Sequence, residues 1–194
     1  MDRTPALGMP RRHTISVPIP FTGAYGSIAA VCAVLAWEWT VSGLDKLVNH
    51  IFVDSFASYV SGTVKPDSPA VWRALLTGVV VPHARLFAIG SIALELTLAT
   101  TFAAAAVALV LRTRHLVRPA LFAVLGAGAV STGFAANLAI LNNDAPPWKL
   151  TGAPFGSGVP VEYLLLLISV AGVVGAGILL RRTRYLARRP GSAR

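Results

Sequence analysis

The chain has 194 residues, of which 55% are hydrophobic and only 13% are charged, and its mean hydropathy is +0.66. A soluble domain has about 25% charged residues, so a surface this poor in charge suits lipid better than water. The net charge of +9 does not by itself indicate nucleic acid, because it follows the rule for membrane topology, as shown below. Cys32 is the single cysteine, which excludes an internal disulfide and a Cys-x-x-Cys motif for dithiol or zinc chemistry.

Hydropathy along the chain predicts four membrane-spanning helices. Residues 1–22 are rich in Pro, Arg and Thr and predict a flexible tail. Each of the four apolar stretches that follow is long enough to cross about 30 Å of hydrocarbon, which takes about 20 helical residues. The stretches are residues 24–48, 83–111, 118–142 and 160–180. We therefore expect an all-α, polytopic membrane protein with a four-helix transmembrane domain over 23–180 and a basic tail over 181–194.

Two longer connections have different compositions. In the connection 49–82, aromatic residues at helical spacing predict one helix that stops at Ser61-Gly62, and a second apolar run predicts a short helix that ends near Pro82. We expect this connection to be partly helical and to lie at the membrane interface. The connection 142–159 is rich in Pro, Gly and Asn, which is typical of a loop.

The positions of Lys and Arg predict the orientation in the membrane. Twelve basic residues lie in the two tails and in the connection 112–118, where Asp2 is the only acid. The other five share the opposite side with the remaining seven acids. Basic segments stay in the cytoplasm, so we expect a multi-pass protein of the plasma membrane with cytoplasmic N- and C-termini. Its partner is then the lipid bilayer, and no nucleic acid is expected.

Two glutamates fall inside the predicted helices. Glu38 lies about ten residues from the outer end of the first helix, which is roughly 15 Å at 1.5 Å per residue. Glu95 lies at a similar depth in the second helix, and Ser131 and Thr132 do so in the third. An ionisable residue at this depth is costly and usually faces the bundle interior or a wet cavity. We therefore expect these side chains to converge.

Further polar residues continue from this depth toward the outer side. They are Ser42, Asp45 and Lys46 in the first helix, His83 and Arg85 at the outer mouth of the second, and Asn137 in the third. The functional interpretation is an outward-opening polar cavity, in which Glu38 and Glu95 handle protons and the other polar residues bind the substrate. The alternative is that the two glutamates are protonated or paired and only hold the helices together.

Other motifs add little chemistry. His50 and His83 both lie near the outer boundary, but no two histidines have the spacing of a metal or haem site, so no metal is expected. No phosphate-binding loop or Ser-His-Asp arrangement is present in the sequence. The glycines of the third and fourth helices predict close helix packing. They are Gly126, Gly128, Gly172, Gly175 and Gly177.

Three places carry a family resemblance. The first helix ends in Trp39-Thr-Val-Ser-Gly-Leu-Asp-Lys-Leu47, which is similar to an "SGxxKL" pattern. The segment Val80-Val-Pro-His-Ala-Arg-Leu-Phe87, followed by Glu95, looks like a second helix with an intramembrane glutamate, and the third helix ends with Asn137 before a loop. In these features the chain resembles the DoxX/DoxD superfamily of small four-helix membrane proteins, over about residues 25–180.

The resemblance implies a function. Some DoxD-type proteins are subunits of thiosulfate:quinone oxidoreductase, so it implies a membrane subunit of a quinone-linked redox system with a redox partner subunit. The residues that carry over are Lys46 and Glu95, with Ser42, Gly43 and Asn137 as packing or cavity residues. In such a subunit Lys46 and Arg85 would attract the anion. Two alternatives stay open: a non-enzymatic scaffold that docks a redox partner, and a small proton-coupled transporter.

Overall fold

The computed structural model describes residues 22–49, 51–64, 69–112, 114–141 and 161–187, and every regular element within these ranges is a helix. The four long helices are α1 (Thr22–Val48), α4 (Ala84–Leu111), α5 (Arg114–Leu141) and α6 (Val161–Ala187). Each contains a segment that is long and apolar enough to cross a membrane. The predicted all-α architecture with four transmembrane helices is therefore confirmed.

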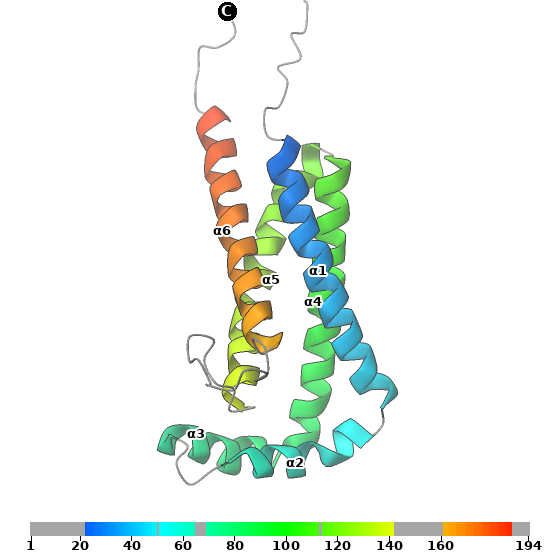
Figure 1. The fold of residues 1–194 in the computed structure, drawn as a ribbon, viewed down its shortest axis with the longest axis vertical. Helices are drawn as coiled ribbons and strands as arrows, with labels where there is room; N and C mark the ends of the chain where they lie inside the picture. Colours follow the sequence, from blue (N-terminus) through cyan, green and yellow to red (C-terminus); the bar gives the residue numbers. More distant parts are fainter. Residues whose placement is uncertain (1–21, 50, 65–68, 113, 142–160, 188–194) are drawn as a thin grey trace, which may run out of the picture.

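The long helices form a bundle with an arm across one end (Figure 1). Neighbouring helices pack as α1 on α4, α4 on α5 and α5 on α6, and contacts between α1 and α6 close the ring. The connection between α1 and α4 contains α2 (Ile51–Thr63), α3 (Ala70–Leu75) and the π-helical turn η1 (Leu76–Val80). These three elements lie across the end of the bundle, and we call them the arm. The predicted helical content of this connection is confirmed.

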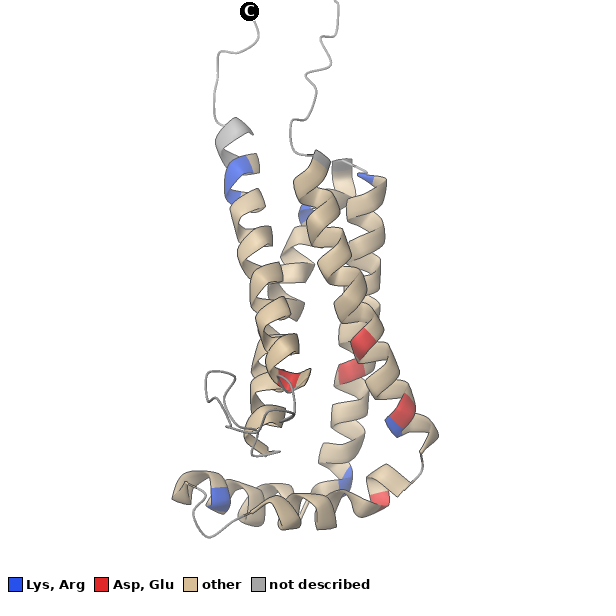
Figure 2. Cartoon of the chain, viewed as in Figure 1, with Lys and Arg blue, Asp and Glu red and all other residues tan. Residues whose placement is uncertain are grey.

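The charged residues divide the bundle into two ends (Figure 2). At the end away from the arm, which we call the basic end, lie Arg112, Arg118, Arg181 and Arg182. The described acidic residues all belong to the half near the arm, and they are Glu38, Asp45, Asp54, Glu95 and Glu162. The described arginines that the sequence places on the predicted cytoplasmic side thus lie together at one end of the bundle. The described acidic residues of the predicted outer side lie together near the other end.

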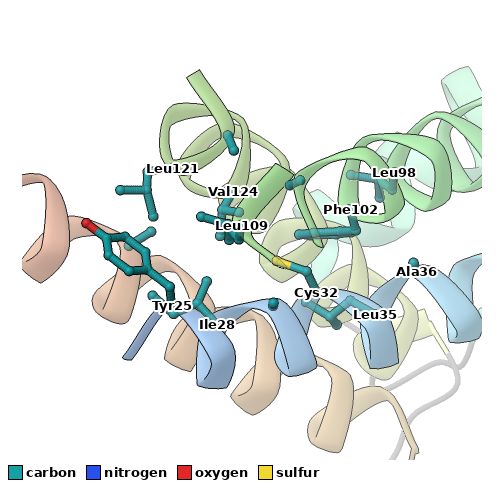
Figure 3. Close-up of a cluster of buried hydrophobic side chains, with 14 of the residues drawn as sticks. Tyr25, Ile28, Cys32, Leu35, Ala36, Leu98, Phe102, Leu109, Leu121 and Val124 are labelled. Carbon is teal, nitrogen blue, oxygen red and sulfur yellow. The ribbon is translucent and has the colours of Figure 1, made fainter. Parts of the chain in front are cut away.

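An apolar core fills the bundle between the basic end and the arm (Figure 3). Its centre contains Cys32, Phe102, Leu109 and Leu121, all of which are fully buried. Cys32 thus packs as a small apolar side chain among larger ones, as a buried free cysteine usually does.

Glycines allow the helices of the core to approach closely. A Cβ added to Gly128 would lie 2.6 Å from Val173 Cγ2, and Cβ atoms added to Gly172 and Gly175 would lie 3.3 and 3.2 Å from atoms of α1 side chains. The predicted close packing is confirmed for these three glycines. It is wrong for Gly126, which faces open space, and Gly177 makes only an ordinary contact at 3.9 Å.

Several predicted element boundaries differ from the observed ones. α2 does not stop at Ser61-Gly62 but continues to Thr63. The Ser61 hydroxyl donates to the Ala57 carbonyl one turn earlier at 2.8 Å, a bond that an intact helical turn accommodates. α5 begins four residues earlier than predicted and contains Pro119 in its second turn, where proline removes the backbone hydrogen bond that the residue would otherwise donate to the His115 carbonyl.

The last helix is also longer than predicted. α6 continues from residue 180 to Ala187, so the first part of the predicted basic tail is helical. Arginines suit this position because positive charge at a helix C-terminus interacts favourably with the helix dipole. The predicted flexible tail over 1–22, except for Thr22, and the predicted loop over 142–159 lie outside the described residues.

Candidate functional site

A cavity of about 450 Å³ lies between the arm and the bundle. Side chains from all six α-helices and from η1 line it. Pockets that bind small organic molecules have volumes of about 300–1,000 Å³, so this cavity is large enough for a ligand. It lies in the acidic half of the bundle, on the side where the sequence predicts a polar cavity.

Aromatic side chains form much of the cavity wall. They are Trp39, Phe52, Phe56, Tyr59, Trp72, Phe87 and Phe134. Three of them come from one face of α2, where the spacing of aromatic residues predicted a helix, and that face is turned toward the cavity. The rings also pack on one another: the centroids of Phe52 and Phe56 are 5.6 Å apart, and those of Trp39 and Phe134 are 5.5 Å apart. Such contacts hold the wall in shape.

An ion pair between α1 and α4 forms one side of the cavity. The Lys46 ammonium contacts Oε1 of Glu95, donates to the Ser42 hydroxyl at 3.1 Å, and lies 5.4 Å from the centroid of the Phe52 ring. Glu95 is fully buried, whereas the Lys46 side chain is 20% exposed and lines the cavity. Lys46 therefore stands between Glu95 and the cavity, and its positive charge is compensated.

Gly43 lies where α1 approaches α4 closely, beside this ion pair. A Cβ at this position would lie 2.9 Å from Cδ2 of Leu96 and 3.3 Å from Cβ of Glu95. The backbone of α1 therefore approaches α4 next to Glu95, at a distance that only glycine permits without a shift of the neighbours. Ser42 and Lys46 are one helical turn apart and share a face. Each residue of the Ser-Gly-x-x-Lys pattern thus has a role. Gly43 allows the close approach of α4, Ser42 supplies a hydroxyl acceptor, and Lys46 supplies the cation.

Glu95 depends on Lys46 for its charge compensation. Its second oxygen, Oε2, is buried and has no hydrogen-bond partner in the described part of the chain. Buried polar atoms without partners are uncommon, because they lose hydration without replacement. Removal of the Lys46 ammonium would therefore leave the whole carboxylate uncompensated.

Glu38 has a different environment. It lies on the same face of α1 as Ser42 and Lys46, it lines the cavity, and its side chain is partly exposed. Within the described residues it makes no hydrogen bond, ion pair or other electrostatic contact. Glu38 therefore presents to the cavity a carboxyl group that no residue in the described part of the chain compensates.

A buried hydrogen-bond chain joins three helices beside the cavity. The Trp39 indole N–H donates to the Ser131 hydroxyl at 3.0 Å, and the hydroxyls of Ser131 and Ser169 are 2.8 Å apart. All three side chains are buried. Sequence reasoning identified Ser131 by its depth but missed Trp39 and Ser169. The signal for Ser169 was its position as the one serine within the apolar run 160–180.

The structure places the predicted site residues in two groups. Glu38, Ser42, Lys46 and Asn137 line the cavity, with Glu95 bonded to Lys46. The Asn137 amide also donates to the Gly133 carbonyl of its own helix at 2.7 Å. Thr132, predicted at the same depth, bonds to the Gly128 carbonyl of its own helix.

Three predicted site residues lie on the exposed surface instead, and they are Asp45, His83 and Arg85. Asp45 points away from the cavity because adjacent helical residues are rotated by about 100°. His83 Nδ1 lies 3.0 Å from the Val79 carbonyl. His50, its possible metal partner, lies outside the described residues, within which no three His, Cys, Asp or Glu side chains are grouped for a metal ion.

No family model, curated protein or solved structure matches this chain. The fold and the site themselves define its class. It is a multi-pass α-helical membrane protein with an aromatic-lined, ligand-sized cavity between its bundle and its arm.

Proposed function

We propose that the chain is a membrane subunit of a quinone-linked redox system, similar to the DoxX/DoxD proteins, and that the cavity holds the quinone headgroup. The observation that carries this proposal is the cavity itself, which combines aromatic and apolar walls with a few polar groups on α1. A flat quinone ring packs well against aromatic side chains. Its carbonyl oxygens would accept hydrogen bonds from the Lys46 ammonium, which lines the cavity.

Glu38 is the group that we assign to proton transfer. Reduction of a quinone to a quinol consumes two electrons and two protons, so the site needs a group that exchanges protons with the ligand. Glu38 lines the cavity and is partly exposed, which suits this task. Glu95 is less suited, because it is fully buried and bonded to Lys46.

The electron donor in this proposal is held by a partner subunit. The single cysteine is fully buried in the bundle core, and Lys46, predicted to attract an anion, is already compensated by Glu95. Arg85, the second candidate for anion binding, is exposed and lies apart from the cavity lining. We therefore place thiosulfate, the anionic donor that the family resemblance implies, on the partner and the quinone on this chain.

We further propose that the protein spans the plasma membrane with its basic end and both termini in the cytoplasm. The support is the division of charge between the two ends of the bundle (Figure 2), because Lys- and Arg-rich ends stay on the cytoplasmic side. In this orientation the cavity lies in the outer half of the membrane and the arm lies at the outer interface.

The test uses the purified full chain in lipid nanodiscs. Binding of a short-chain quinone should quench tryptophan fluorescence, and the quenching should fall in Trp72→Phe, which changes the cavity wall, but not in Trp37→Phe, because Trp37 is 68% exposed on the outside of the bundle. Quinone reduction by thiosulfate is then measured with and without co-purified subunits. Absence of quenching, together with absence of turnover under both conditions, contradicts the proposal.

A second candidate is a small proton-coupled transporter. The position of Glu38 favours it, because an ionisable group that faces a cavity in a spanning helix is typical of proton-coupled pathways. Proton flux into liposomes that stops in Glu38→Gln, together with absence of quinone reduction, would favour this candidate over the first.

A further inference from the structure

The charges that line the cavity are mainly negative. Lys46 supplies a positive charge, but Glu95 compensates it. Glu38 lines the cavity and has no partner within the described residues. The Glu162 carboxyl group also lines the cavity, but it has an interaction of its own, so Glu38 is the group that can pair with a ligand. The cavity therefore attracts positive charge, which is the opposite of the anion site that the basic residues of the sequence predicted.

The aromatic wall also favours a cation. The face of an aromatic ring carries negative electrostatic potential, and a cation over the ring is attracted to it most strongly where water is excluded. The cavity already contains one example, since the Lys46 ammonium lies 5.4 Å from the Phe52 centroid. Phe56 and Trp72 belong to the same cavity and come from the arm.

Two further properties restrict the kind of cation. The walls are largely apolar, so a small metal ion would lose its hydration without enough oxygen ligands to replace it. A large cation with aromatic or alkyl groups is weakly hydrated and buries apolar surface as it binds. The volume of about 450 Å³ is sufficient for such a molecule.

We propose that this cavity binds lipophilic organic cations, such as quaternary phosphonium or ammonium compounds, with Glu38 as their counter-ion. The inference does not rest on the redox proposal, because a neutral quinone would leave Glu38 uncompensated whereas a cation pairs with it. The aromatic side chains from the arm and from α1 surround the organic groups, and Lys46 remains paired with Glu95.

The experiment measures tetraphenylphosphonium binding to the purified full chain in detergent by equilibrium dialysis. Wild type should bind it saturably. Glu38→Gln should weaken binding about tenfold or more, which corresponds to about 1.4 kcal/mol of binding free energy. Asp45→Asn is the matched control, since it removes the same charge from the same helix at an exposed position outside the cavity lining, and it should bind as wild type does.

A neutral probe separates charge recognition from apolar burial. Triphenylphosphine oxide has similar aromatic groups but no net charge, so it should bind more weakly than the cation and should be insensitive to Glu38→Gln. If Glu38→Gln does not fold, Trp72→Ala carries the test, and it should weaken binding of the cation more than binding of the neutral probe.

Three results would overturn the inference. They are absence of saturable cation binding to wild type, equal binding to wild type and to folded Glu38→Gln, and equal loss in Glu38→Gln and Asp45→Asn. The redox proposal fails separately, through absence of quinone quenching and turnover. Cation binding without quinone binding therefore supports the cation site and contradicts the redox proposal.

Discussion

Lys46 of α1 and Glu95 of α4 form an ion pair in which the carboxylate is fully buried and the ammonium reaches the cavity. The pair joins two helices at the point where Gly43 brings their backbones together. It also affects the charge of the cavity, because Lys46 is compensated whereas Glu38 has no partner among the residues that the structure describes. This one contact therefore affects helix packing, the stability of the bundle and the charge that the cavity presents to a ligand.

The two partners of the ion pair should respond differently to substitution. Lys46→Met leaves the buried Glu95 carboxylate without compensation and should lower the free energy of unfolding by about 3 kcal/mol or more. Glu95→Gln should have a smaller effect, because the Lys46 ammonium is partly exposed. The double variant Lys46→Met/Glu95→Met should recover most of the loss. Thermal unfolding in detergent measures all three, and additive losses in the double variant would contradict this account of the pair.

Any side chain added at position 43 should lower the free energy of unfolding. Gly43→Ala places a Cβ 2.9 Å from Leu96 Cδ2 and 3.3 Å from Glu95 Cβ, and such overpacking costs about 1–3 kcal/mol. Gly90→Ala is the matched control, because no atom lies within 4 Å of its added Cβ, and it should be neutral or slightly stabilising. Adding Leu96→Ala to Gly43→Ala should restore part of the stability. Equal thermal stability of the two alanine variants would show that α1 and α4 are not closely packed at Gly43.

The hydrogen-bond chain beside the cavity should contribute to stability as a unit. Ser131→Ala removes the acceptor of the buried Trp39 indole and the partner of Ser169, so we expect a loss of about 1–3 kcal/mol. Thr97→Ala serves as control, because its exposed hydroxyl bonds only to the Ala93 carbonyl of its own helix. In the double variant Trp39→Phe/Ser131→Ala the loss should be less than additive. Full additivity in thermal unfolding would contradict the coupling.

The proposed orientation is tested by labelling single cysteines on intact cells with a membrane-impermeant maleimide. In a Cys32→Ser background, Arg73→Cys in the arm should be labelled directly. Arg182→Cys at the basic end should be labelled only after permeabilisation. Wild type is the control, because Cys32 is fully buried and should not react. The reverse pattern of labelling would place the arm and the cavity on the cytoplasmic side.

Much of the fold could be predicted from the sequence because hydropathy and charge act locally. A run of about 20 apolar residues crosses a bilayer as a helix whatever its neighbours are, and all four predicted spans appear as α1, α4, α5 and α6. Element boundaries were less predictable. α2 continues through Ser61-Gly62 and α6 extends to Ala187, because the propensity of single residues is only a weak determinant of where a helix ends.

The candidate site was predictable only in part. Depth along the helix selected Glu38, Glu95 and Ser131, because distance from a helix end can be counted in residues. Depth contains no information about rotation, so the exposed positions of Asp45 and Arg85 could not be distinguished from the position of Lys46 at the cavity wall. Trp39 and Ser169 were missed for a related reason. Their hydrogen-bond partners lie on other helices, and the residues next to them in the sequence do not indicate such partners.

Hydropathy and charge, counted residue by residue along the chain, were enough to predict a four-helix membrane protein with one basic end and one acidic end. Three features appear only in the folded chain: Lys46 is paired with Glu95, Glu38 lines the cavity without a partner among the described residues, and the arm completes the aromatic cavity. The physical reason is that these features depend on how helices rotate and how closely they approach, which packing at residues such as Gly43 controls.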